Sequence, residues 1–107
     1  APVPVMLFEE SGSIAYVNDA ALDFLEVADA TALDDVTMPE LLVEDDRDEA
    51  LGRFRQLFED GDPAPETEFR VRTFDGTVKR AVVATAPGIY RDQQVAQAVA
   101  RRVLETE

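Results

Sequence analysis

Residues 9–25 read EESGSIAYVNDAALDFL, and this stretch decides the fold. An acidic turn around Gly12 leads into a short strand at residues 14–17. Asn18 ends the strand, and Asn or Asp at such a point favours the start of a helix, so we expect Asn18 or Asp19 to cap one. The helix carries a broad apolar face made of Ala21, Leu22, Phe24 and Leu25.

Another strand is expected just before this stretch. Residues 5–8 are a short apolar run, and the turn at residues 9–13 lets them pair with residues 14–18 as a hairpin. Residues 1–4, Ala-Pro-Val-Pro, are interpreted as a leading segment, because proline cannot donate a hydrogen bond to a central strand ladder. We therefore expect the sheet to start at residue 5.

A polar bridge at residues 29–37 separates the first helix from the next. Thr37 and Glu40 have the spacing of a capping box, and the proline between them is tolerated in a first helical turn. This pattern predicts a short helix through Leu41 and Leu42.

The best-specified helix in the chain follows. Asp46 and Glu49 provide a further box-like start. Apolar residues then recur at helical spacing, at Ala50, Leu51, Phe54, Leu57 and Phe58. The opposite, polar face carries Arg53, Arg55, Gln56 and Glu59. Gly61 stands where the C-terminus of a helix favours a left-handed residue, so we expect the helix to end there.

The period of the pattern changes to two after a loop at residues 62–65. Three residues alternate with charged ones, as in a half-buried strand: Phe69, Val71 and Thr73. The dipeptide Asp75-Gly76 is a strong signal for a tight hairpin turn. We therefore expect residues 77–86 to form the next strand, which ends at the Pro-Gly pair of residues 87–88.

Residues 94–104, QVAQAVARRVL, fit two structures. Their alanines favour a helix, whereas the alternation of Gln97, Val99 and Arg101 also fits a strand, and periodicity alone leaves both open. In either case the strands are segregated from the helices along the chain. This order is typical of an α+β fold, with helices on one face of an antiparallel sheet.

A chain of 107 residues has the size of one domain, and we expect residues 1–107 to form a single one. Because the net charge is −13, we do not expect a basic face that binds phosphate groups, and hence we do not expect a nucleic-acid partner. No apolar run approaches the ~18 residues of a membrane span, so no direct membrane insertion is expected. The acidic excess with a single lysine, Lys79, resembles proteins of salt-loving archaea, where salt screens the repulsion between surface charges. An ordinary acidic domain is the alternative.

The chain has neither histidine nor cysteine, and this composition excludes several chemistries. A His-ligated haem, a cysteinyl–flavin adduct, a Ser-His or Cys-His nucleophile and a zinc site of Cys or His ligands cannot be built. The acidic run Glu44, Asp45, Asp46, Asp48 and Glu49 does not match the calcium-loop template, and we interpret it as a solvated surface. We therefore expect no catalytic residues, no metal ligands and no enzymatic activity.

Several segments, in the right order, resemble the PAS sensor family. GSIAYVNDAALDFL (residues 12–25) is similar to its first hairpin and helix, and LVEDDR (residues 42–47) to the segment before its long helix. FRVRTFDGTVKRAVVATA (residues 69–86) is similar to two of its strands, joined by the Asp-Gly turn. The resemblance covers residues 5–103. It implies a PAS-like fold, a five-stranded antiparallel sheet with short helices and one longer helix packed on one face, in which residues 94–103 form the central fifth strand.

The family commonly encloses a small molecule between the sheet and the helices, and the resemblance implies the same place here. The matching positions are Asn18 as a polar contact, together with Phe24, Leu25, Met38, Leu41, Leu42, Phe54, Leu57, Phe69 and Val71. This set suits a small apolar or aromatic molecule that binds non-covalently. The alternative is that these residues are simply the core, because apolar residues at such periods are core by default.

The resemblance also implies a sensory domain of a larger cytoplasmic signalling protein, such as a sensor kinase or transducer, that relays ligand occupancy to a downstream domain. Many PAS domains end in an Asp-Ile-Thr triplet, whereas the matching place here reads Arg102-Val103-Leu104. Residues 104–107 are expected to begin the linker to that downstream domain.

A different interpretation rests on the outer face of the sheet. Val78, Val82 and Ala84 are expected on one face of their strand, and Ala81 and Val83 on the other. Both faces are therefore partly apolar, and an exposed apolar sheet face is a candidate homodimer surface. A ligand-free dimerisation module is the second interpretation of the chain, and a small enzyme is the third.

Overall fold

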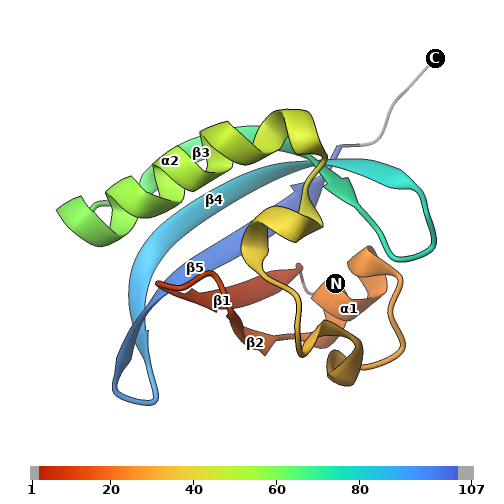
Figure 1. The fold of residues 1–107 in the computed structure, drawn as a ribbon, viewed down its shortest axis with the longest axis horizontal. Helices are drawn as coiled ribbons and strands as arrows, with labels where there is room; N and C mark the ends of the chain where they lie inside the picture. Colours follow the sequence, from red (N-terminus) through yellow and green to blue (C-terminus); the bar gives the residue numbers. More distant parts are fainter. Residues whose placement is uncertain (1–2, 104–107) are drawn as a thin grey trace.

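The computed structural model describes residues 3–103, where antiparallel strands form a sheet of order β2-β1-β5-β4-β3. The strands are β1 (Val5–Glu9), β2 (Ile14–Val17), β3 (Ala64–Arg72), β4 (Val78–Tyr90) and β5 (Gln93–Arg102). The helices are α1 (Asp19–Leu25) and α2 (Glu44–Asp60), with two 3₁₀ helices between them, η1 (Ala30–Leu33) and η2 (Met38–Leu41). The helices gather on one side of the sheet (Figure 1), which confirms the expected α+β architecture. The expected start of a linker at 104–107 lies outside the described residues.

The segment that periodicity left open is a strand, β5, at the centre of the sheet. β1 and β4 flank it, so that Val99 pairs with Val5 on one side and with Ala84 on the other. Backbone ladders on both sides outweigh the helical preference of its alanines, because tertiary pairing overrides a weak local propensity.

The side chain of Asn18 makes hydrogen bonds both to the start of β1 and to the start of α1. Its side-chain oxygen accepts hydrogen bonds from the backbone N–H groups of Ala21 (2.9 Å) and Val5 (3.0 Å). Its amide donates to the carbonyl of Val3 (2.9 Å). One side chain therefore caps α1, as expected, and also fixes the start of β1 against the start of that helix.

The other end of α1 is held by the β3–β4 hairpin. Lys79, which is only 8% exposed, donates from Nζ to the carbonyl of Phe24 and to Oε2 of Glu26, both at 2.7 Å. Its ammonium also lies 5.0 Å from the centre of the Phe24 ring. The backbone N–H of Phe74 donates to the carbonyl of Leu25 (2.9 Å). A cation at the C-terminal end of a helix interacts favourably with its dipole, so these contacts fasten α1 to the sheet.

The start of α2 differs from the expectation. The helix begins at Glu44, and Asp46 lies in its first turn rather than capping it. The Asp46 carboxylate instead accepts hydrogen bonds from the backbone N–H (2.7 Å) and the guanidinium Nη2 (2.8 Å) of Arg70 on β3. These hydrogen bonds lower the pKa of Asp46. The box-like spacing was misleading because a strand distant in sequence provides the partner for this carboxylate. The C-terminal end of α2 is as expected, with Gly61 in the left-handed conformation at φ 71°.

The β3–β4 hairpin turns at Asp75-Gly76, as expected, with Gly76 at φ 93°. The Asp75 carboxylate accepts hydrogen bonds from the hydroxyls of Thr73 and Thr77, and these bonds lower its pKa to about 2. The lowered pKa keeps this carboxylate ionised, and able to accept these bonds, to a lower pH than an ordinary aspartate.

The expected end of the next strand at residues 87–88 is wrong, since β4 continues to Tyr90. Pairing with β3 reaches only as far as the Ala64–Thr85 pair, whereas pairing with β5 continues to the Tyr90–Gln93 pair. Beyond Thr85, no strand of the described part of the chain lies beside the outer edge of β4. A proline there removes no ladder hydrogen bond, which is why Pro87 is tolerated inside the strand.

Candidate functional site

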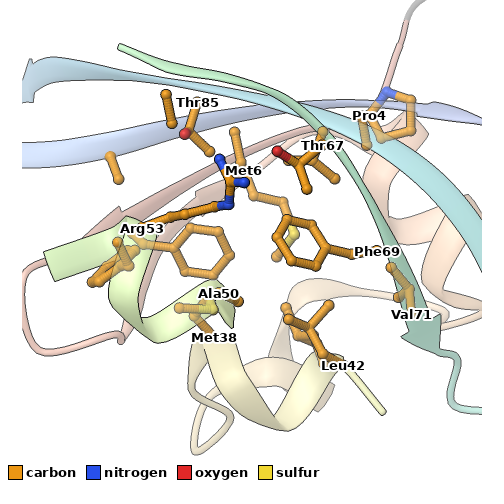
Figure 2. Close-up of a pocket in the computed structure, with 18 of the residues that line it drawn as sticks. Pro4, Met6, Met38, Leu42, Ala50, Arg53, Thr67, Phe69, Val71 and Thr85 are labelled. Carbon is orange, nitrogen blue, oxygen red and sulfur yellow. The ribbon is translucent and has the colours of Figure 1, made fainter. Parts of the chain in front are cut away.

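A cavity of about 120 Å³ lies between the inner face of the sheet and the helices. Figure 2 shows its lining, which is apolar apart from a few polar groups. Strands β1, β3, β4 and β5 form its wall on the sheet side, and α1, η2 and α2 close the other sides. The core of the protein therefore contains space as well as packed side chains.

Nine of the ten residues expected to surround a ligand line this cavity. They are Phe24, Leu25, Met38, Leu41, Leu42, Phe54, Leu57, Phe69 and Val71. They come from four elements, α1, η2, α2 and β3, and from the residue that follows η2, and the fold brings them together around one space. Their contact with a ligand stays a prediction.

Asn18 lies outside the cavity, so its assignment as a polar ligand contact does not fit the structure. Its side chain is already bonded to Val3, Val5 and Ala21. The sequence pattern places Asn18 next to a helix with cavity-lining residues, but capping that helix turns the side chain toward the backbone instead.

Further lining residues escaped the sequence reasoning. The sheet contributes Met6 and Phe8 from β1, Val83 from β4, and three alanines from β5, which are Ala96, Ala98 and Ala100. The alternation of these alanines was visible in the sequence, but it becomes a signal only once β5 is known to be a strand. Small side chains at the centre of the sheet leave the space that larger ones would fill.

Aromatic rings border the cavity. The rings of Phe8 and Phe54 meet edge to face with centres 6.2 Å apart, and Phe54 meets Phe58 in the same way at 5.0 Å. Such pairs are favourable beyond the area they bury. They hold Phe54 and Phe8 in defined positions, so the wall of the cavity has a definite shape.

The polar part of the lining consists mainly of Arg53 on α2, Thr67 on β3 and Thr85 on β4. Arg53 was expected on the polar face of its helix, away from the apolar residues, and this expectation is wrong. Its long aliphatic stem lets the guanidinium turn back toward the sheet, as Figure 2 shows. Helical periodicity places the Cα atom correctly but does not place the end of an arginine side chain.

The outer face of the sheet is also partly apolar. Since Met6, Thr67, Val83 and Ala98 line the cavity, strand alternation turns their neighbours outward. The outward apolar residues at the centre of the sheet are Val5, Leu7, Val82, Ala84 and Val99. At one side of this face Tyr16, 44% exposed, lies with its ring centre 6.0 Å from that of Tyr90. The expectation that both faces of β4 are partly apolar agrees with this arrangement.

Among residues 3–103, no three acidic side chains converge as a metal site, so the acidic run at the start of α2 does not form one there. In the same part of the chain, no helix combines the length and the apolar character needed to cross a bilayer. Within residues 3–103, the geometry favours the cavity as the candidate site.

Comparison with known proteins gives the same fold. Residues 1–103 match the family model described as the PAS fold. A comparison with curated protein sequences finds no significant match.

Solved structures of PAS domains are similar to this chain over nearly its whole length. One is the PAS domain of a protein from Desulfitobacterium hafniense, with a TM-score of 0.81, 14% identity, and coverage of 96% of this chain and 94% of that one. Another is the PAS domain of an HTR-like protein from Haloarcula marismortui, with a TM-score of 0.80, 16% identity, and coverage of 96% and 83%. The Cycle PAS-B domain of Drosophila melanogaster, solved with bound ethylene glycol, has a TM-score of 0.81, 8% identity, and coverage of 94% and 99%. At these identities the likeness concerns the fold. The match of the family model over almost the entire chain carries the assignment, and the chain belongs to the PAS family of sensory and signalling domains.

Proposed function

We propose that this domain senses a small apolar or aromatic molecule, which binds non-covalently in the cavity and whose occupancy is relayed to a downstream domain of a cytoplasmic signalling protein. The observation that carries the proposal is the cavity itself. It is lined by four phenylalanines, Phe8, Phe24, Phe54 and Phe69, and by aliphatic residues from both layers of the fold. The Drosophila Cycle PAS-B domain, which has the same fold, was solved with bound ethylene glycol, and this supports the proposal.

The volume of the cavity limits the size of the ligand. An apolar cavity of about 150 Å³ engineered into another protein stays dry and binds benzene. The cavity here, about 120 Å³, therefore suits a single six-membered ring or a short aliphatic chain, and excludes a flavin or a haem without rearrangement. Apolar walls offer water no hydrogen bonds, so such a cavity favours an apolar ligand over water.

A relay from the cavity to the sheet can start at Phe24. Its ring lines the cavity, and the Lys79 ammonium lies 5.0 Å from the centre of that ring. A ligand that displaces the ring changes the contacts of Lys79, which stands on β4 beside the central strand. Occupancy of the cavity would then change the position of α1 relative to the sheet. A ligand that binds more tightly to one of two such positions shifts the population toward it.

Filling the cavity tests the proposal. Ala98 lies on β5 and lines the cavity, so Ala98→Leu adds a larger side chain to the space that a ligand would occupy. We expect wild-type protein to show chemical-shift changes for cavity residues when toluene is titrated in heteronuclear NMR, and the variant to lose them. Ala32→Leu is the matched control, because Ala32 is exposed on η1 and does not line the cavity. Absence of toluene binding to the wild type, or equal binding to Ala98→Leu, contradicts the proposal.

The apolar outer face favours a second function, association of two copies through their sheets. A homodimer would bury the outward apolar residues around Val99 at the centre of this face. We expect sedimentation velocity to show a concentration-dependent dimer that Val99→Glu converts to a monomer, because a charge at the centre of an apolar interface is costly to desolvate. Ala32→Glu, at an exposed residue of η1 on the helix side of the sheet, should leave the dimer intact. A dimer that Val99→Glu leaves unchanged uses another surface, and a monomer at all concentrations contradicts the second function.

A further inference from the structure

We propose that the ligand is a small carboxylic acid, with an apolar body in the cavity and its carboxylate bound by Arg53 and Thr85. This inference rests on the proposed sensory function and names the chemical class that the cavity would select. It follows from the polar groups at one end of an otherwise apolar lining, and from the donors that these groups still have available.

Among the described residues, Arg53 is the one charged residue that lines the cavity. Its Nε and Nη2 atoms both contact Oε2 of Glu49, at 3.2 and 3.1 Å. Within residues 3–103 no partner is recorded for Nη1, so the far end of the guanidinium keeps donors for another group. A guanidinium can bind two carboxylates at once, along different edges, and its forked geometry matches the two oxygens of a carboxylate.

The pair with Glu49 leaves Arg53 able to bind a second anion. Its two side chains are 35% (Arg53) and 56% (Glu49) exposed, and ion pairs this accessible to water contribute little to stability. A ligand carboxylate held against the cavity wall is better shielded from water, and its charge-assisted hydrogen bonds are correspondingly stronger. Glu49 therefore positions the guanidinium without occupying it fully.

Thr85 provides a second donor. Its side chain lines the cavity, and within the described part of the chain its hydroxyl has no recorded hydrogen-bond partner. No side-chain oxygen there is both fully buried and unpaired, so this hydroxyl has open space beside it. Thr67 differs, because its hydroxyl already donates to the carbonyl of Pro65 (3.1 Å). In Figure 2 the guanidinium of Arg53 points toward the side of the cavity where these two threonines lie.

The negative charge of the chain restricts where an anionic ligand can bind. The chain carries a net charge of −13, and Asp60 and Asp62 line a second hollow that Arg53 also borders. This field disfavours anions in general, so a carboxylate gains binding only where it reaches the guanidinium. Salt weakens the field between exposed charges, with a Debye length of about 3 Å at 1 M, and affects a partly buried contact much less. We therefore expect carboxylate binding to persist, or to strengthen, as KCl is raised.

Matched ring compounds test the class of ligand. Benzoate, benzamide and toluene share the ring, but only benzoate carries a charge. We expect NMR titration of the wild-type domain to give the lowest dissociation constant for benzoate, and Arg53→Gln to raise that constant about tenfold or more without changing the one for toluene. Thr85→Val, which keeps the shape of the side chain, should weaken benzoate several-fold and leave toluene unchanged. Arg55→Gln, at an exposed arginine on the same helix that does not line the cavity, makes the same change of charge as a control.

The possible outcomes separate this inference from the proposed function. Selective loss of benzoate in Arg53→Gln but not in Arg55→Gln supports both. Binding of toluene and benzamide as tight as that of benzoate, or an equal effect of the two arginine variants, overturns the carboxylate assignment while the sensory cavity stands. Failure of all three ring compounds to bind the wild type overturns both.

Discussion

Replacing Lys79 by methionine is expected to lower the free energy of unfolding by about 2 to 3 kcal/mol, a cost typical of losing hydrogen bonds from a buried charged donor. Methionine keeps most of the apolar stem but cannot donate to the carbonyl of Phe24 or to the carboxylate of Glu26. The Phe24 carbonyl at the end of α1 is then left without this partner. Urea unfolding followed by circular dichroism measures the loss.

Glu26→Gln separates the two contacts of Lys79. The Glu26 side chain is 43% exposed, so its ion pair with Lys79 is accessible to water and is expected to contribute less than about 1 kcal/mol. The glutamine variant keeps an oxygen acceptor for Lys79 and leaves the bond to Phe24 intact. If Glu26→Gln is as destabilising as Lys79→Met, the ion pair rather than the helix carbonyl holds α1, and our account of this contact is wrong.

Asn18→Ala is expected to lower the free energy of unfolding by about 2 to 3 kcal/mol, the sum of a lost helix cap and an unpaired backbone N–H. The side chain serves Ala21, Val5 and Val3 together, and alanine serves none of them. Loss of the bond to Val5 also frees the start of β1 next to the central strand. Hydrogen exchange should therefore become faster at the amides of Ala21 and Val5 than elsewhere in the sheet.

Asn18→Asp provides the matched comparison. Aspartate keeps the oxygen that accepts from Ala21 and Val5, and loses only the donor to the Val3 carbonyl, which lies in an exposed contact. We expect a loss of less than about 1 kcal/mol, because aspartate is as good a helix cap as asparagine and its charge complements the helix dipole. A loss as large as that of Asn18→Ala would assign the stabilisation to the Val3 contact and contradict the capping argument.

Most elements of the fold could be predicted because local patterns and tertiary packing agree in them. The capped start of α1, the glycine end of α2 and the Asp75-Gly76 turn each depend on neighbouring residues. The errors arise where a residue distant in the chain decides the structure. Asp46 bonds to Arg70 on β3, and β4 passes through its proline because one of its edges has no neighbour there.

The site could be predicted in its apolar part and not in its polar part. Apolar residues that recur at helical spacing or alternate with charged ones face the core by default, so the positions of Phe54, Leu57 and Phe69 followed once the fold was recognised. Polar side chains follow hydrogen-bond partners instead, and spacing does not reveal these. Asn18 turned to the backbone, and Arg53 turned from the polar face of its helix to the cavity.

The strand order has a consequence for how the chain folds. β5 is the last strand of the described chain, and it alone joins the β1–β2 hairpin to the β3–β4 hairpin. Its pairing of Val5 with Val99 closes a loop of nearly the whole chain, and such distant contacts form slowly. During synthesis both hairpins emerge from the ribosome before the strand that connects them. Until then each exposes an unpaired strand edge, so the nascent chain is more prone to aggregate than the finished domain.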